Sequence, residues 1–201
     1  MQLVIVNTGC ANISSVRFAI ERLGYQPVVS DDAAVIQAAD KVFLPGVGSA
    51  PAAMAQINAK GLAPVIQSLT QPTLGICLGM QLMTQSSEES AVAGSNTPCL
   101  GLIDTQVKKM QVGELRLPHM GWNQIKVAKD NPLFAGISDG SYFYFVHGYA
   151  VEVGSHTLAA CQYGVDFSAS IGQNNFYGVQ FHPERSADAG AALLQNFIKN
   201  T

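Results

Sequence analysis

The chain has 201 residues, of which 48% are hydrophobic and only 12% charged, and its formal net charge is −3. This composition suits one folded domain with a sizeable core and argues against disorder, while the slightly acidic balance and the lack of a Lys/Arg run argue against nucleic-acid binding. No apolar run approaches the roughly 20 residues of a membrane helix, and the four cysteines include no CxxC pair, which disfavours a membrane anchor, a disulfide framework and a structural zinc site.

The first 87 residues alternate short apolar runs with segments of helical spacing. LVIVN (3–7) predicts a buried strand and not a signal peptide, because no basic segment precedes it and polar residues soon follow. The cysteine usage leads us to expect a cytoplasmic protein. A helix follows, with Asn12 or Ser14 as its cap and Gly24 at its end. Further strands are predicted at 27–30, 41–46 and 72–76, and further helices at 31–39, 62–70 and 77–87. This alternation indicates βαβ units and a parallel sheet with helices on both faces.

The pattern changes after about residue 88. Residues 88–101 are predicted as a loop, and short strand-like runs follow at 114–127, 142–153, 156–164 and 167–182. Gly, Asn and Pro interrupt these runs, which suggests that antiparallel strands join the sheet. A final amphipathic helix is predicted over 186–200. With no repeat or linker in sight, we expect one α/β domain over 1–201, built on an open, mixed, mostly parallel sheet.

Cys77 lies between two glycines in TLGICLGMQLM (73–83), where a predicted strand ends and a helix begins. A sharp turn at this point would project the sulfur outward and would need small neighbours, which Gly75 and Gly79 supply. The helix N-terminus would also favour the thiolate. A buried structural cysteine is the alternative interpretation of this segment taken alone.

A nucleophilic cysteine needs a base, and the candidates are His119, His147, His156 and His182. His182 is preferred because GVQFHPE places it at the end of another apolar run, with Glu184 two residues further on. A carboxylate so close can hold one ring nitrogen and leave the other for the sulfur.

Acyl transfer also needs donors for an oxyanion. The segment LPGVGSA (44–50) follows the third predicted strand, and Gly46 and Gly48 would let main-chain N–H groups approach a substrate. The N–H of Leu78, directly after the nucleophile, is the expected second donor. A plain glycine turn is the alternative for 44–50.

The segments LPGVGS, GICLGMQ and GVQFHPE, in this order, resemble the triad (class I) glutamine amidotransferases, which have a flavodoxin-like α/β fold. NTGCANISSV near the start, LPHMGWN (117–123) and YFVHGY (144–149) are similar to the glutaminase subunits of imidazole glycerol phosphate synthases of histidine biosynthesis. The resemblance covers essentially the whole chain. It implies hydrolysis of glutamine to glutamate and ammonia through a cysteine thioester.

The resemblance also implies roles for individual residues. Cys77, His182 and Glu184 would form the catalytic triad. The implied glutamine contacts are Gly46, Val47, Gly48, Leu78, Gln81, Gly148 and Tyr149. Asn12, Met120 and Trp122 are the implied contacts with a partner. None of the other cysteines lies between two glycines as Cys77 does. We expect Cys10, Cys99 and Cys161 to be ordinary core or surface residues without a catalytic role.

The implied partner is a cyclase subunit that receives the ammonia in a heterodimer and forms imidazole glycerol phosphate and the ribonucleotide AICAR. No metal or cofactor is expected, and no Walker-type phosphate loop occurs. Three alternatives stay open: a glutaminase serving another synthase, such as anthranilate or pyridoxal phosphate synthesis; a non-catalytic regulatory subunit; and a cysteine hydrolase such as a peptidase.

Overall fold

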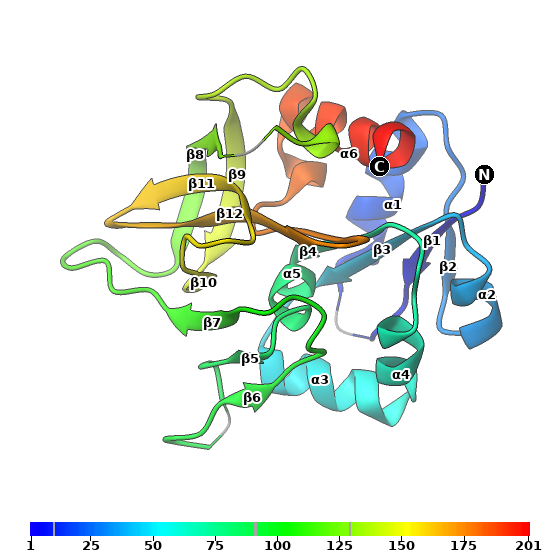
Figure 1. Cartoon of the computed structure of the whole chain (residues 1–201), viewed down its shortest axis with the longest axis horizontal. Helices are drawn as coiled ribbons and strands as arrows, with labels where there is room; N and C mark the ends of the chain where they lie inside the picture. The colour runs from blue at the N-terminus through cyan, green and yellow to red at the C-terminus, as the bar shows by residue number, and fades with distance from the viewer. Residues whose placement is uncertain (10, 91, 129) are drawn as a thin grey trace.

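A nine-stranded mixed sheet forms the centre of the molecule in the computed structural model, which describes residues 1–9, 11–90, 92–128 and 130–201. The strand order is β2-β1-β3-β4-β13-β12-β11-β8-β9 (Figure 1). The strands are β1 (Leu3–Val6), β2 (Val28–Ser30), β3 (Lys41–Gly46), β4 (Thr73–Cys77), β8 (His119–Val127), β9 (Tyr142–His147), β11 (Thr157–Tyr163), β12 (Val165–Gln173) and β13 (Phe176–Val179).

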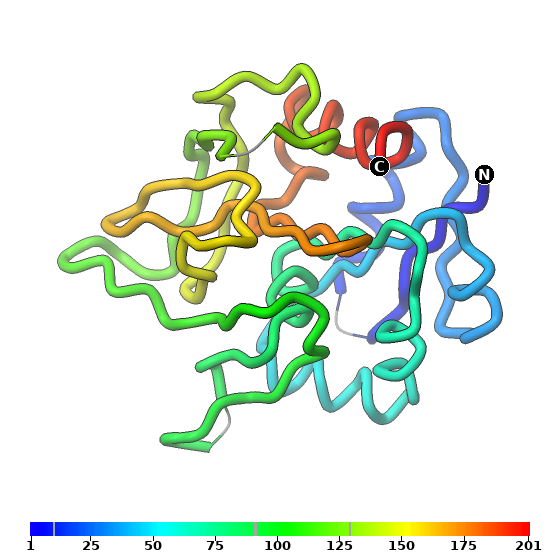
Figure 2. Tube along the Cα trace, viewed as in Figure 1, coloured from blue at the N-terminus to red at the C-terminus, as the bar shows by residue number. Residues whose placement is uncertain are grey.

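The sheet divides into a parallel half and an antiparallel half. The pairs from β2 to β13 are parallel, and those from β13 to β9 are antiparallel. Figure 2 shows the orange segment of β12 and β13 returning from the periphery to the middle of the molecule, where it joins the two halves. A smaller sheet, in the order β10-β7-β5-β6, lies beside the main one. Its strands are β5 (Ser86–Ser87), β6 (Thr97–Pro98), β7 (Gln106–Lys109) and β10 (Tyr149–Val151).

Helices cover both faces of the main sheet. One face carries α1 (Ile13–Arg22), α6 (Ala187–Asn200) and the 3-10 turn η1 (Pro132–Phe134), and the other carries α2 (Ala33–Gln37), α3 (Ala50–Ala59), α4 (Leu62–Gln67) and α5 (Leu78–Leu82) (Figure 1). A second 3-10 turn, η2 (Pro183–Arg185), precedes α6.

Strand β1 shows why this arrangement follows from the sequence. Its side chains alternate between the two layers: Leu3 and Ile5 pack with α1 and α6, while Val4 and Val6 pack with α2, α3 and α4. All four residues are fully buried, since the period-2 side chains of a parallel strand meet a helix layer on each face.

The predicted α/β class and the mixed sheet with helices are confirmed. The cap is Asn12, whose side-chain oxygen accepts from the N–H of Ser15. The helix predicted over 77–87 is wrong in length: α5 ends at Leu82, and β5 begins four residues later. Helix α3 was not predicted. The runs at 142–153 and 167–182 each prove to be two strands, because turns interrupt them at Gly148 and at 174–175.

Candidate active site

Cys77 occupies a strained turn between β4 and α5. Its backbone has a φ of 54° and a ψ of −113°, a region that residues with a side chain rarely adopt. The predicted sharp strand-to-helix turn is therefore confirmed. The turn leaves Cys77 at the carboxyl end of β4, in register with Gly46 at the end of β3. In an open α/β sheet this edge is where ligands bind.

The glycines around Cys77 are required by the close approach of α5 to the sheet. A Cβ on Gly79 would overlap the main-chain oxygen of Leu44, and a Cβ on Gly75 would lie 2.7 Å from the main-chain nitrogen of Met80. A Cβ on Gly46 would lie 2.8 Å from the nitrogen of Gly79. These three glycines thus let α5 start directly behind Cys77, which aims its first-turn N–H groups, including that of Leu78, at the end of the strand.

His182 and Glu184 form the second part of the site, on the segment between β13 and α6. Nδ1 of His182 lies 2.7 Å from Oε1 of Glu184, and the Glu184 side chain is only 2% exposed. Pro183 between them starts the η2 turn, which returns the carboxylate to the imidazole. The main-chain N–H of His182 donates to the carbonyl of Tyr144 at 2.9 Å, which ties this segment to β9.

The electrostatics of the site favour a charged imidazole. Burial opposes the positive charge, but hydrogen-bonding and charge interactions with Cys77 and Glu184 outweigh it and raise the pKa of His182 to about 10. Nε2 of His182 is buried and meets no partner at full hydrogen-bond distance among the described residues. It is therefore the ring atom left to face Cys77 and a substrate between them.

A cavity of about 280 Å³ connects these groups. The residues that line it come from five segments of the chain: Val47, Gly48, Cys77, Leu78, Gln81, Glu89, Val146, His147, Gly148, Tyr149 and His182. This set includes every predicted glutamine contact except Gly46, which packs beneath α5 beside Cys77. Gly48 has a φ of +94°, so its backbone requires glycine.

Gln180 belongs to the site and was missed by the sequence reasoning. It is fully buried, its Nε2 lies 3.9 Å from Sγ of Cys77, and its Oε1 accepts a hydrogen bond from Nε2 of Gln81 at 2.8 Å. The signal was available: Gln180 is a polar residue inside the apolar run that ends at His182. Since side chains alternate along the chain here, Gln180 faces α5 while Val179 and Phe181 face the α1–α6 layer.

Glu89 was also missed. It lines the cavity from the loop after β5, and its Oε2 accepts from the N–H of Ala50 at the start of α3 at 2.8 Å. No described residue donates a hydrogen bond to the other carboxylate oxygen, which can therefore accept from a cationic group. No spacing signal marks this residue in the sequence, because it lies in a loop.

The main chain of Tyr149 faces the same cavity. The N–H of Met110, which follows β7, donates to the carbonyl of Gly148 at 3.1 Å. In an antiparallel pair, residues that are hydrogen-bonded to the partner strand alternate with residues that are not. The N–H and the carbonyl of Tyr149, the next residue, therefore point away from β7. Its carbonyl accepts from Gln81 Nε2 at 3.0 Å and lies 2.9 Å from Nδ1 of His147. The N–H of Tyr149 therefore points to the side on which Gln81 lies.

The predicted partner contacts lie away from the cavity. Met120 and Trp122 project from one face of β8 and are 62% and 52% exposed. The ring of Trp122 meets the ring of Tyr144 on β9 edge-on, with centroids 6.1 Å apart. Asn12 is exposed at the start of α1, where its structural role is the helix cap.

The remaining cysteines differ from Cys77. Burial raises the pKa of the Cys99 thiol to about 11 and that of Cys161 to about 12. Cys10 lies outside the described residues. Within the described ranges there is no cluster of three or more His, Cys, Asp or Glu side chains that could hold a metal ion, and no helix there is long and apolar enough to span a membrane.

Comparisons with known proteins agree with this geometry. Residues 4–201 match the family model of glutamine amidotransferase class-I. The chain is 57% identical over 199 residues to imidazole glycerol phosphate synthase subunit HisH of Yersinia pseudotuberculosis serotype I, covering 99% of this chain and 100% of the relative. It is 53% identical to subunit HisH 1 of Vibrio vulnificus, with 98% of each chain covered.

Solved structures share the fold at low sequence identity. A putative GMP synthase protein from Thermoplasma acidophilum superposes with a TM-score of 0.74 at 17% identity, covering 98% of this chain and 92% of that one. The structure of PurLQS from Thermotoga maritima gives a TM-score of 0.71 at 18% identity, covering 98% and 97%.

Proposed function

Because the chain belongs to the class-I glutamine amidotransferase family, we propose how its cavity hydrolyses glutamine and which residues take part. The chain is a glutaminase of histidine biosynthesis, the subunit of imidazole glycerol phosphate synthase that releases ammonia from glutamine. The observation that carries the residue assignment is the strained turn of Cys77, which shares one cavity with a His182 that Glu184 holds by Nδ1.

The first half-reaction forms a thioester. The thiolate of Cys77 attacks the side-chain amide carbon of glutamine, and the carbonyl oxygen becomes an oxyanion. The N–H of Leu78, at the start of α5, and an N–H of the Val47–Gly48 segment are its donors. The imidazolium of His182 then gives its Nε2 proton to the amide nitrogen, the C–N bond breaks, and ammonia leaves.

The second half-reaction releases glutamate. Neutral His182 takes a proton from water, the resulting hydroxide attacks the thioester carbon, and the C–S bond breaks to regenerate the Cys77 thiolate and the imidazolium. Glu184 keeps Nδ1 protonated in both steps, so that Nε2 always faces the cavity. The high pKa of His182 suits this cycle, because the proton needed by the leaving nitrogen is already on the imidazole.

Polar groups at the other end of the cavity suit the α-amino and α-carboxylate groups of glutamine. Glu89 offers a free carboxylate oxygen for the ammonium group. The main chain of Gly148 and Tyr149 would hold the α-carboxylate, with the Tyr149 N–H as donor. Gln81 supports the Tyr149 carbonyl and lines the wall between the two ends. The cavity lies below the roughly 300–1,000 Å³ of sites for drug-sized ligands, which favours a single amino acid over a peptide.

The chain functions in a complex, as the names of its relatives indicate. We propose a heterodimer with a cyclase subunit that docks on the face of β8 carrying Met120 and Trp122, and that Asn12 adds a contact at the start of α1. Two large apolar side chains exposed on one strand face are typical of an interaction surface. One domain, 1–201, would contain the whole glutaminase, and the cytoplasm is the expected compartment.

Site-resolved labelling tests the assignment. A glutamine-mimicking electrophile should modify Cys77 and spare Cys99 and Cys161, whose raised pKa values keep them as thiols, and Cys10. An excess of glutamine should protect Cys77, and a panel of small peptides should not. Equal labelling of all four cysteines, or protection by peptides, would contradict the assignment and favour another hydrolase.

A further inference from the structure

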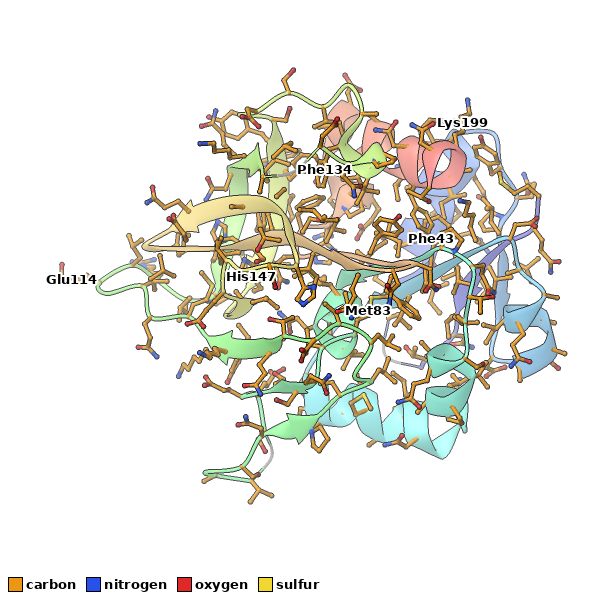
Figure 3. All side chains as sticks on the ribbon, in the orientation of Figure 1. Phe43, Met83, Glu114, Phe134, His147 and Lys199 are labelled. Carbon is orange, nitrogen blue, oxygen red and sulfur yellow. The ribbon has the colours of Figure 1, made fainter. Side chains whose placement is uncertain are left out.

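Two buried histidines that the reaction does not use face each other across β8 and β9. His119 and His147 are register partners on these antiparallel strands and are 3% and 6% exposed. Nδ1 of His119 lies 3.0 Å from Nε2 of His147. The ring of His119 is stacked between Phe145 and Tyr163, at centroid distances of 5.0 and 4.1 Å. Figure 3 places His147 in the interior of the molecule, in contrast to Glu114 and Lys199 at its periphery.

Both rings are neutral at physiological pH. Burial lowers the pKa of His119 to about 4. Burial also lowers the pKa of His147, to about 3. The hydrogen bond to the Tyr149 carbonyl opposes this effect, and weaker interactions with His119 and His182 add to the lowering. A neutral imidazole has one donor nitrogen and one acceptor nitrogen. His119 contacts Asn123 and His147, and His147 contacts His119 and the Tyr149 carbonyl, so each ring can make its two hydrogen bonds in only one tautomer.

The direction of each of these hydrogen bonds follows from the Tyr149 carbonyl at the end of the series. The Tyr149 carbonyl can only accept, so Nδ1 of His147 carries the proton at 2.9 Å. Nε2 of His147 is then an acceptor, and Nδ1 of His119 must donate to it. Nε2 of His119 accepts in turn from Nδ2 of Asn123 at 3.2 Å. Asn123, His119 and His147 thus form one directed chain of hydrogen bonds that ends on the Tyr149 carbonyl.

We propose that His119 and His147 are positioning residues that hold the Tyr149 carbonyl and so fix the backbone of Tyr149 for glutamine binding. This rests on the proposed function, in which the Tyr149 N–H holds the α-carboxylate. The residue before Tyr149 is Gly148, around which a Cβ would meet nothing within 4 Å, so side-chain packing does not restrain this turn. Hydrogen bonds to the main chain restrain it instead. The peptide group that carries the Tyr149 N–H is held by the Met110 N–H, which donates to the Gly148 carbonyl, and the next peptide group is held by the two hydrogen bonds from His147 and Gln81 to the Tyr149 carbonyl.

The pair also connects the cavity to the strand that carries the partner-facing residues. His119 and Asn123 project from one face of β8, and Met120 and Trp122 project from the other. A shift of β8 on docking would therefore reach the Tyr149 carbonyl through this chain of hydrogen bonds.

The test uses a matched pair of substitutions in the complex with the cyclase subunit. His147→Leu and His147→Asn are nearly equal in size, but only Asn keeps a donor for the Tyr149 carbonyl. We expect His147→Leu to raise the KM for glutamine roughly 10-fold with a much smaller change in kcat, because one buried hydrogen bond is lost. His147→Asn should recover much of this loss. His156→Leu, a histidine outside the cavity, is the control and should change neither parameter.

Labelling of Cys77 separates positioning from a general structural role. Iodoacetamide has no α-carboxylate, so its rate at Cys77 should be unchanged in His147→Leu, while the rate of the glutamine-mimicking electrophile should fall roughly 10-fold. An unchanged KM, or an equal loss of both labelling rates, would overturn the proposal. If His147→Leu does not fold, His119→Leu against His119→Asn gives the same comparison one hydrogen bond further away. Wild-type complex that shows no glutamine-selective labelling would instead overturn the proposed function.

Discussion

Gln180 donates towards the sulfur of Cys77 from 3.9 Å while its Oε1 accepts from Gln81 at 2.8 Å. One fully buried amide thus contacts both the proposed nucleophile and a wall of the glutamine cavity. Removing it would leave the sulfur without this donor and would take from Gln81 Nε2 one of its two acceptors, the other being the Tyr149 carbonyl.

We therefore predict that Gln180→Leu lowers kcat/KM for glutamine about tenfold, since a hydrogen bond to a charged group contributes about 1.5–3 kcal/mol and this one is long. Cys77 should also react more slowly with iodoacetamide in this variant, because the sulfur loses a hydrogen-bond donor. Gln180→Glu should cost more, because it places a carboxylate oxygen at the sulfur. Gln71→Leu removes a glutamine that bonds the main chain of Ile36, outside the cavity, and serves as the control. An unchanged rate of Cys77 labelling by iodoacetamide in Gln180→Leu would contradict a role at the sulfur.

His182 and Glu184 should differ in their contribution to the rate. His182→Asn removes the group that moves the proton, and we expect glutamine turnover to fall by roughly 10²–10⁴-fold. Glu184→Gln leaves an imidazole in place and should cost less, because the carboxylate only orients the ring and stabilises its charge. Steady-state kinetics of the two complexes, with circular dichroism to verify folding, make the comparison. A greater loss in a folded Glu184→Gln complex would reverse the roles.

The stability of the fold should depend on His182 at alkaline pH. Its pKa is raised from 6.5 to about 10 in the folded chain, so the folded state holds a proton that the unfolded state releases between these values. The stabilisation is complete below pH 6.5 and is lost as the pH rises through 10. In urea unfolding, the difference in free energy of unfolding between wild type and His182→Asn should narrow as the pH rises from about 6 to about 10. A difference that widens over this range would contradict the assigned charge state.

Trp122 should matter for assembly and not for the fold. Trp122→Ala should weaken binding of the cyclase subunit by at least about tenfold, because aromatic side chains dominate protein interfaces. Val28→Ala is a suitable control, since Val28 is also exposed but lies on β2, at the opposite end of the nine-stranded sheet from β9. Isothermal titration calorimetry measures both affinities. Equal affinities for the two variants would place the docking surface elsewhere.

The parts of the site that could be predicted from the sequence depend on local signals. The sharp turn at Cys77 depends on the neighbouring glycines at 75 and 79, and the turn from His182 to Glu184 depends on the proline between them. Each signal lies within a few residues of the feature that it predicts. Helix α3 could not be predicted from the sequence. Its N-cap and first residues, Ser49 to Pro51, have the same turn-like composition as the glycine segment before them, so no signal marks where the helix begins.

What could not be predicted depends on strand register. His119 and His147 are 28 residues apart and meet only because β8 and β9 pair at that offset. Gln180 and Gln81 are 99 residues apart and meet because α5 packs on the strand segment after β13. Register between distant strands is set by packing across the whole sheet, and a single sequence contains no local signal for it.

A comparison of two nitrogen sources in one assay tests Cys77 as the nucleophile of an ammonia-supplying glutaminase. Wild-type and Cys77→Ser chains are each combined with the cyclase subunit plus its ribonucleotide substrate, and imidazole glycerol phosphate is measured with glutamine or with an ammonium salt. We predict that Cys77→Ser abolishes product from glutamine and retains product from ammonium. Glutamine-dependent product from the Cys77→Ser complex, at a rate near that of wild type, would contradict this role of Cys77.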